Sequence, residues 1–214
     1  MKSLLTLACL SLLVLVSNPV CAQDTETKPP PTAHSSFGMK AHYGAAIVTT
    51  EGMGSGVESE TGAAWSLGVF WTYSSGGLIS FAVQPELMYV SETGTLNYSG
   101  IAGSTIKAES IRLPILLKME LFNRALIQPS VYAGPSFGYV VNGTSTVGTI
   151  TSDIDGLNTF QVGLAMGVDV TVLNFFVVDF RYNLGLTDLA EQSFNGYTAS
   201  MKMSSFRIGL GLRF

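Results

Sequence analysis

The stretch Phe206-Arg207-Ile208-Gly209-Leu210-Gly211-Leu212-Arg213-Phe214 alternates strictly between two kinds of side chain. A strand with this period of two carries large apolar residues on one face and only glycine and arginine on the other. In a water-soluble protein the apolar face would pack on a core. A narrow polar interior behind a glycine and arginine face, with the apolar row turned to lipid, fits these residues better. The stretch therefore predicts the closing strand of a transmembrane β-barrel, with the apolar row Phe206, Ile208, Leu210, Leu212 and Phe214 on the outside.

The whole chain is too apolar for an ordinary soluble domain. Of its 214 residues 47% are hydrophobic and 12% are charged, and the mean hydropathy is +0.37. Beyond the N-terminal segment, no run approaches the roughly 18 uncharged apolar residues that a membrane helix needs. Apolarity that is spread over short alternating segments indicates strands in lipid. The formal net charge is -4, without the clustered Lys and Arg that a nucleic-acid-binding role needs.

Residues 1–22 have the features of a secretory signal peptide. Lys2 precedes an apolar stretch, and the small residues Val20 and Ala22 stand at the positions that signal peptidase reads. We therefore expect export to the outer membrane and cleavage after Ala22. Residues 23–35 are polar and proline-rich, which predicts an extended periplasmic linker, and residues 36–214 form the predicted barrel.

Both cysteines, Cys9 and Cys21, lie inside the predicted signal peptide. The mature chain would then have neither a disulfide nor a thiolate metal site, and we expect no cofactor and no metal. Acylation of Cys21 in a lipoprotein is the weaker alternative, because Asn18-Pro19-Val20 lacks the usual preceding leucine and small residues.

Eight alternating segments predict an all-β fold, an eight-stranded antiparallel transmembrane up-and-down β-barrel. An even number of strands, with short turns at the periplasm and longer loops outside, is the layout of a bacterial outer-membrane barrel. Eight strands enclose an interior that side chains just fill, so we expect no open pore. Pro85 cannot donate to the ladder and predicts a bulge. The segments span residues 37–48, 63–73, 79–89, 111–121, 127–139, 160–170, 176–185 and 206–214, and the long loops between them are 49–61, 91–107, 142–158 and 187–203.

The inward positions of these strands carry nearly balanced charges of both signs. A buried charge without a partner costs several kcal/mol, so the charges must pair in a filled lumen. We expect a salt-bridge network that braces the barrel, and a proton or ion path is the alternative. The predicted network comprises Lys40, Glu86, Arg112, Lys118, Glu120, Asp169, Asp179, Arg181, Arg207 and Arg213.

The histidines decide how well an enzymatic function fits the chain. Small barrels of the outer membrane include enzymes that modify lipid A, and these need an activated nucleophile or water, usually with a histidine base. His34 falls in the predicted linker and His42 faces inward in mid-strand. A lone lumen imidazole more often hydrogen-bonds to its neighbours than activates a serine. We therefore predict no catalytic residues and a protein that is not an enzyme, with a lipid A-modifying enzyme as the alternative.

The long loops predict an acidic extracellular rim. Capture of divalent cations or of a basic surface partner is one interpretation, and a solvated loop surface is the favoured one, because no run has the ligand spacing of a calcium loop. The loop acids are Glu51, Glu58, Glu60, Glu92, Asp153, Asp155, Asp188 and Glu191, against Lys107 and Lys202.

Five stretches of the chain, taken in order, point to a family. They are Gln84–Leu87, Ile111–Lys118, Tyr132–Gly138, Asp179–Leu186 and Gly209–Phe214. These stretches resemble the PorT-like outer-membrane β-barrel family. The resemblance covers Phe37 to Phe214 and implies the same fold and an outer-membrane location. The namesake of this family takes part in a protein secretion and maturation pathway. For this chain we expect a structural, interaction or secretion-accessory role, with outer-membrane lipid as a partner. The C-terminal alternation also resembles the signal that the barrel-assembly machinery reads, which implies that machinery as a transient partner.

Overall fold

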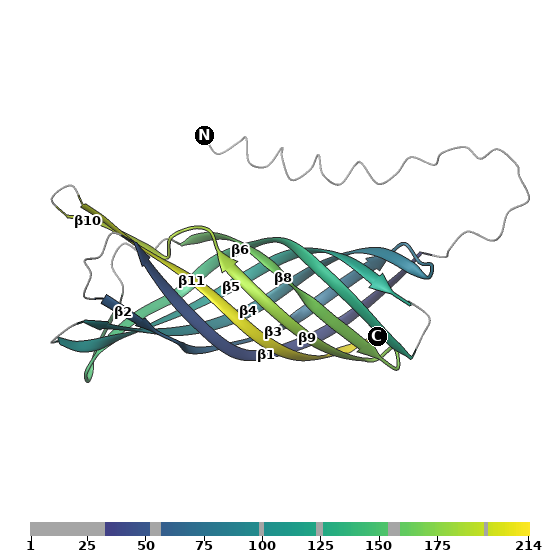
Figure 1. Cartoon of the computed structure of the whole chain (residues 1–214), viewed down its shortest axis with the longest axis horizontal. Coiled ribbons are helices and arrows are strands. Elements are labelled where there is room, and N and C mark those ends of the chain that lie inside the picture. The colour runs from purple at the N-terminus through teal and green to yellow at the C-terminus, as the bar shows by residue number, and fades with distance from the viewer. Residues whose placement is uncertain (1–32, 52–56, 99–100, 123–125, 154–158, 195–196) are drawn as a thin grey trace, which may run out of the picture. The chain divides into compact units, whose positions relative to one another are not determined.

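The computed structural model describes residues 33–51, 57–98, 101–122, 126–153, 159–194 and 197–214. Within these ranges eight strands, β1, β3, β4, β5, β6, β8, β9 and β11, form an antiparallel barrel that closes where β1 pairs with β11 (Figure 1). The predicted fold class is confirmed. The strands are β1 (His34–Glu51), β2 (Val57–Glu60), β3 (Gly62–Ser74), β4 (Ile79–Tyr98), β5 (Ile101–Leu121), β6 (Ile127–Val147), β7 (Ile150–Asp153), β8 (Phe160–Val172), β9 (Phe176–Gly185), β10 (Ala190–Phe194) and β11 (Tyr197–Arg213).

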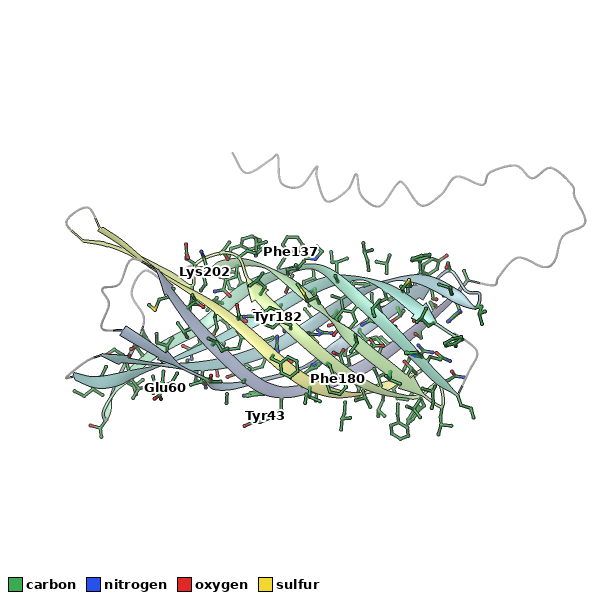
Figure 2. All side chains as sticks on the ribbon, viewed as in Figure 1. Tyr43, Glu60, Phe137, Phe180, Tyr182 and Lys202 are labelled. Atoms are coloured by element: carbon green, nitrogen blue, oxygen red, sulfur yellow. The ribbon has the colours of Figure 1, made fainter. Side chains whose placement is uncertain are left out.

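The side chains alternate across the wall as the sequence predicts. Large apolar residues stand exposed on the outer face, where Tyr43 is 68% and Leu210 is 69% exposed. Tyr43, Phe180 and Tyr182 project from the outside of the wall (Figure 2). On the inner face of the same strands, Lys40 and Arg207 are only 2% exposed. The outer wall is therefore apolar and the lumen is polar. This is the inverse of a soluble protein and the pattern of a barrel in lipid.

The strands extend further than the apolar alternation predicts. Most of the predicted loop 91–107 belongs to β4 and β5, and much of the predicted loops 142–158 and 187–203 belongs to β6, β7, β10 and β11. The outward residues of these extensions are polar, for example Thr93 and Lys107. The apolar period ends where lipid ends, although backbone pairing continues into water.

The predicted bulge at Pro85 is wrong. Pro85 pairs with Ile115 on β5, and the register of β4 against β5 is the same on both sides of it. On the β3 side, the pairing stops after Glu86 and resumes in the same register at Val83. The missing N–H thus interrupts one ladder without shifting it. The register shifts of the barrel wall occur instead between Leu96 and Tyr98 and between Glu109 and Ser110, outside the predicted strands.

The barrel starts at His34 instead of at residue 36. The amide nitrogen of Phe37 donates to the carbonyl oxygen of Phe214 at 3.0 Å, which ties the start of β1 to the end of β11. The predicted signal peptide and nearly all of the linker lie outside the described residues. Among the residues that the structure describes, no helix is long and apolar enough to cross a membrane.

Candidate functional site

The middle of the lumen holds an ionic cluster, which we define as Lys40, Glu86, Lys118, Asp169, Asp179 and Arg181. Its residues come from β1, β4, β5, β8 and β9, whose inward positions converge on the barrel axis. The Nζ atom of Lys40 lies 2.8 Å from Asp179, 3.5 Å from Glu86 and 3.8 Å from Asp169. The Nζ atom of Lys118 lies 2.7 Å from Asp169. Three cations thus face three carboxylates, so the cluster is electrically neutral.

Arg181 is the most connected member of the cluster. Its guanidinium donates to both carboxylate oxygens of Glu86, at 2.5 and 2.9 Å, and to Asp179 at 3.2 Å. The hydroxyl of Tyr132 donates to Asp179 at 2.5 Å and accepts from Arg181 Nε at 3.1 Å. Such a bidentate pair with further hydrogen bonds is the geometry in which buried charges are best compensated.

Two glycines leave room for large side chains of the lumen. A methyl group at Gly167 would lie 2.6 Å from the hydroxyl of Tyr132, and one at Gly209 would collide with the His42 ring and lie 2.7 Å from its Nε2. Gly209 belongs to the glycine face of the C-terminal stretch, so at this position the glycine has a packing reason: it makes space for the His42 ring.

Among the described residues, the remaining charges of the predicted network form two separate ion pairs, and Arg207 is the one residue outside them. Arg112 donates to Glu92 at 3.3 and 2.5 Å, and Arg213 lies 3.8 Å from Glu120. Arg207 is 2% exposed, and its Nε has no hydrogen-bond partner in the structure. The structure thus places nine of the ten predicted residues in ion pairs within the described chain, with Arg207 as the remaining one.

Glu92 is the lumen residue that the sequence reading missed. The predicted loop 91–107 places Glu92 on the acidic rim, yet its side chain is 1% exposed inside the barrel. The signal that would have found it is parity: Glu86, Met88, Val90 and Glu92 share the inward face if β4 continues. The rim therefore has one acid fewer than predicted.

His42 lies between a serine and a carboxylate. Its Nδ1 is 3.2 Å from Ser66 Oγ and its Nε2 is 3.6 Å from Asp179 Oδ2. The three residue types are those of a serine hydrolase triad, but the hydroxyl lies at Nδ1 and the carboxylate beside Nε2, the reverse of the triad arrangement. Ser66 is only 2% exposed, and Asp179 is already engaged by Lys40, Arg181 and Tyr132. In this conformation the hydroxyl has no open approach for a substrate.

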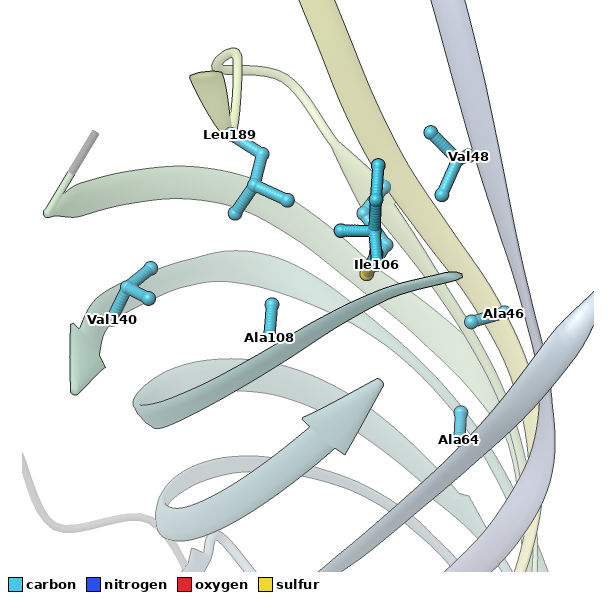
Figure 3. Close-up of a cluster of buried hydrophobic side chains, with 8 residues drawn as sticks. Ala46, Val48, Ala64, Ile106, Ala108, Val140 and Leu189 are labelled. Carbon is cyan, nitrogen blue, oxygen red and sulfur yellow. The ribbon is translucent and has the colours of Figure 1, made fainter. Parts of the chain in front are cut away.

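A cluster of buried apolar side chains, which we call the apolar plug, lies inside the barrel wall (Figure 3). It lies on the extracellular side of the ionic cluster, because Ala46 and Val48 follow Lys40 along β1 toward the long loops. Its central members are Val48, Ile106 and Leu189, which are at most 4% exposed. Leu189 belongs to the segment between β9 and β10, and its amide donates to the carbonyl oxygen of Met201 at 2.6 Å, which holds the segment in the mouth. The plug comprises Ala46, Val48, Ala64, Ile106, Ala108, Val140, Leu189 and Met203.

At the level of the apolar plug, the outer face of the barrel wall turns polar. The apolar belt, which on β4 runs from Ile79 to Tyr89 and on β5 from Ile111 to Leu121, is followed by Lys107 and Glu109. Lys107 Nζ lies 2.6 Å from Glu109, and Asn142 donates to the same carboxylate at 3.1 Å. The hydrogen bond from Lys107 lowers the pKa of Glu109 from its ordinary value of 4.5, and the bond from Asn142 adds to this.

The apolar C-terminal row, from Phe206 to Phe214, lies on the outer face within the belt. Among the described residues, no group of His, Cys, Asp and Glu could hold a metal ion.

Several solved structures similar to this chain are small outer-membrane barrels. Neisserial surface protein A is 14% identical, with a TM-score of 0.45, and the alignment covers 83% of this chain and 97% of that one. OprG from Pseudomonas aeruginosa is 13% identical, with a TM-score of 0.49 and coverage of 84% and 95%. Ail of Yersinia pestis is 11% identical, with a TM-score of 0.39 and coverage of 84% and 98%. No curated protein matches the sequence significantly.

The sequence itself carries a family signature. Residues 22–191 match the family described as "Outer membrane protein beta-barrel domain". Because the match spans most of the 214 residues, the chain belongs to the outer membrane protein β-barrel domain family and is an outer-membrane protein.

Proposed function

We propose that this outer-membrane protein is a non-enzymatic barrel with no open pore, which acts as a structural, interaction or secretion-accessory component. The observation that supports this proposal is the double filling of the lumen. The ionic cluster occupies the middle with side chains that are at most 5% exposed, and the apolar plug covers it on the extracellular side. An ion on the barrel axis would have to displace both fillings.

Conductance tests the closed lumen directly. The processed protein is reconstituted into a planar lipid bilayer, with an open porin as the positive control. We expect no step currents from the wild type, and none from Leu189→Ser, because the ionic cluster still fills the lumen when the plug is weakened. Step currents from the wild-type protein would refute a closed barrel.

The interaction role requires a partner. A pull-down of the tagged protein from detergent-solubilised outer membrane, followed by mass spectrometry, distinguishes the two forms of the proposal. A stable complex with secretion components would support the secretion-accessory role. Recovery with lipid alone would support a structural role. The exposed C-terminal row, Phe206 to Phe214, is the surface through which we propose transient contact with the barrel-assembly machinery.

Processing after Ala22 is a further part of the proposal. Intact-mass measurement of the protein purified from outer membranes should give the mass of a chain that starts at Gln23. A chain that starts at Cys21 and carries acyl groups would contradict it and would support the lipoprotein alternative.

A lipid A-modifying enzyme is the second candidate, and the Ser66–His42–Asp179 arrangement is the observation in its favour. It ranks second because Ser66 is buried and Asp179 is saturated by other partners. Mass spectrometry of lipid A from cells with and without the protein tests it. A lost or added acyl chain that disappears in both His42→Ala and Ser66→Ala would overturn the non-enzymatic proposal.

A further inference from the structure

Above the apolar belt, β4, β5 and β6 continue as a sheet that rises on one side of the barrel. β2 pairs with β4 and β7 pairs with β6, so five strands extend this sheet beyond the closed wall. Figure 1 shows these extensions at the end of the barrel that carries β2 and β10, the end opposite the short turns. Because short turns mark the periplasmic end, this sheet lies at the cell surface.

The outward face of this sheet carries a ladder of threonines. Cross-strand register places Thr95 opposite Thr105, Thr105 opposite Thr146, and Thr146 opposite Thr151. The four form one continuous row across β4, β5, β6 and β7, and the last two are linked by a hydroxyl hydrogen bond of 2.9 Å. A second row, closer to the membrane, runs through Thr93, Lys107, Thr144 and Asp153.

We call these two rows the threonine face. In such a sheet neighbouring strands lie about 4.8 Å apart and same-face residues of one strand about 6.8 Å apart, so the hydroxyls form a regular grid. A hydroxyl both donates and accepts hydrogen bonds, as the hydroxyls of a sugar do. One lysine stands against Glu60, Glu109 and Asp153 on or beside this face, so it does not have the cation cluster that phosphate or sulfate recognition requires.

The opposite wall of the barrel differs at two cross-strand pairs. There β1 and β11 bring together Ile47 with Ser204 and Thr49 with Lys202, so each pair sets one hydroxyl against an apolar or a charged side chain. At these pairs no threonine faces another threonine, unlike Thr95 with Thr105 and Thr105 with Thr146.

The position of the face indicates what covers it. It continues directly from the apolar belt, which ends at Tyr89 on β4, and Tyr89 is linked to Glu109 at the margin of the face. A lipid whose acyl chains contact the belt therefore places its headgroup against the threonine rows. We propose that the threonine face binds the neutral sugar residues of an outer-leaflet glycolipid. This inference rests on the proposed interaction role and is independent of the closed lumen, which the conductance measurement reads separately.

Lipid retention tests the proposal. The processed full-length barrel is placed in nanodiscs that contain equal mole fractions of rough-type lipopolysaccharide, which carries core sugars, and phosphatidylglycerol, and native mass spectrometry counts the lipids retained. The variant is Thr95→Val, Thr105→Val and Thr146→Val together. Valine keeps the β-branched shape and the strand preference of threonine, so the strands remain intact. We expect the variant to retain roughly tenfold less lipopolysaccharide, because it loses several hydrogen bonds.

The matched control is Thr49→Val with Ser204→Ala, which removes hydroxyls from the opposite wall and should retain as much lipopolysaccharide as the wild type. Equal retention by the triple variant and the wild type would overturn the proposal. The proposal would also be overturned if the wild-type protein retained lipid A without core sugars as well as it retains lipopolysaccharide, because binding would then rest on phosphate or acyl chains. A loss in Lys107→Met as large as in the triple variant would likewise indicate phosphate recognition and overturn it. If the triple variant fails to fold, as judged by heat-modifiable gel mobility, Thr105→Val alone should show a reduction of the same sign.

Discussion

The ionic cluster and the apolar plug fill the same lumen with opposite chemistry. In the cluster, Arg181 and Glu86 are buried together and compensate each other through two hydrogen bonds. In the plug, Ile106 and Leu189 are equally buried but offer no polar atom. The difference follows from their surroundings. The middle of the lumen is far from water on both sides, where inward charges persist only if they pair, whereas the mouth adjoins water, which apolar side chains exclude.

The largest expected effect comes from breaking the ionic cluster. Arg181→Leu leaves Glu86 without its bidentate partner and should lower the free energy of unfolding by about 3–5 kcal/mol, the usual cost of removing one partner of a buried ion pair. The transition is followed by circular dichroism and by heat-modifiable gel mobility in detergent. We also expect no conductance, because the plug remains. Lys107→Met, which removes a lysine on the outer surface, is the control and should change stability little. An unchanged melting temperature for Arg181→Leu would contradict a bracing role.

Truncation in the plug should cost less. Ile106→Ala removes buried methyl groups and leaves no uncompensated charge, so we expect a loss of about 2–4 kcal/mol. Leu186→Ala is the control, because Leu186 is 53% exposed. Denaturant titration in the same detergent measures both variants. A loss for Ile106→Ala that exceeds the loss for Arg181→Leu would show that hydrophobic packing at the mouth, more than ion pairing, stabilises the barrel.

A third change sharpens the comparison at the boundary between the two fillings. Gly209→Ala adds a methyl group that meets the ring of His42, and overpacking of this kind costs about 1–3 kcal/mol. His42→Ala removes the ring, so the double variant should recover most of that loss. A double-mutant cycle of unfolding free energies gives the coupling. Additive effects would mean that the glycine is required for backbone reasons instead of for the space it leaves.

The same contrast explains what the sequence predicts well. Within the membrane every outward residue faces lipid and every inward one faces the lumen, so parity alone assigned Lys40, Asp179 and Arg181 correctly to the interior. Above the belt the outward faces of β4 and β5 meet water, so the outward apolar row disappears from the sequence while the strands continue. Glu92 was misplaced for that reason. The pairing of particular charges, such as Lys118 with Asp169 on non-adjacent strands, depends on the stagger of the closed barrel, which no local pattern contains.

The smallest effect concerns an ion pair outside both fillings. The hydrogen bond from Lys107 holds the pKa of Glu109 below its ordinary value of 4.5. A carboxyl group with a lowered pKa contributes stability above its unfolded pKa and loses that contribution as the pH falls through its folded pKa. Because Lys107 is 47% exposed, solvent screens the pair and the contribution should stay below about 1 kcal/mol. Lys107→Met should therefore raise the pKa of Glu109, read by NMR titration of its carboxyl carbon, and leave the melting temperature at pH 7 almost unchanged. The contrast with Arg181→Leu would then separate buried charges that stabilise the barrel from surface charges that contribute little to its stability. A large destabilisation by Lys107→Met would contradict that distinction.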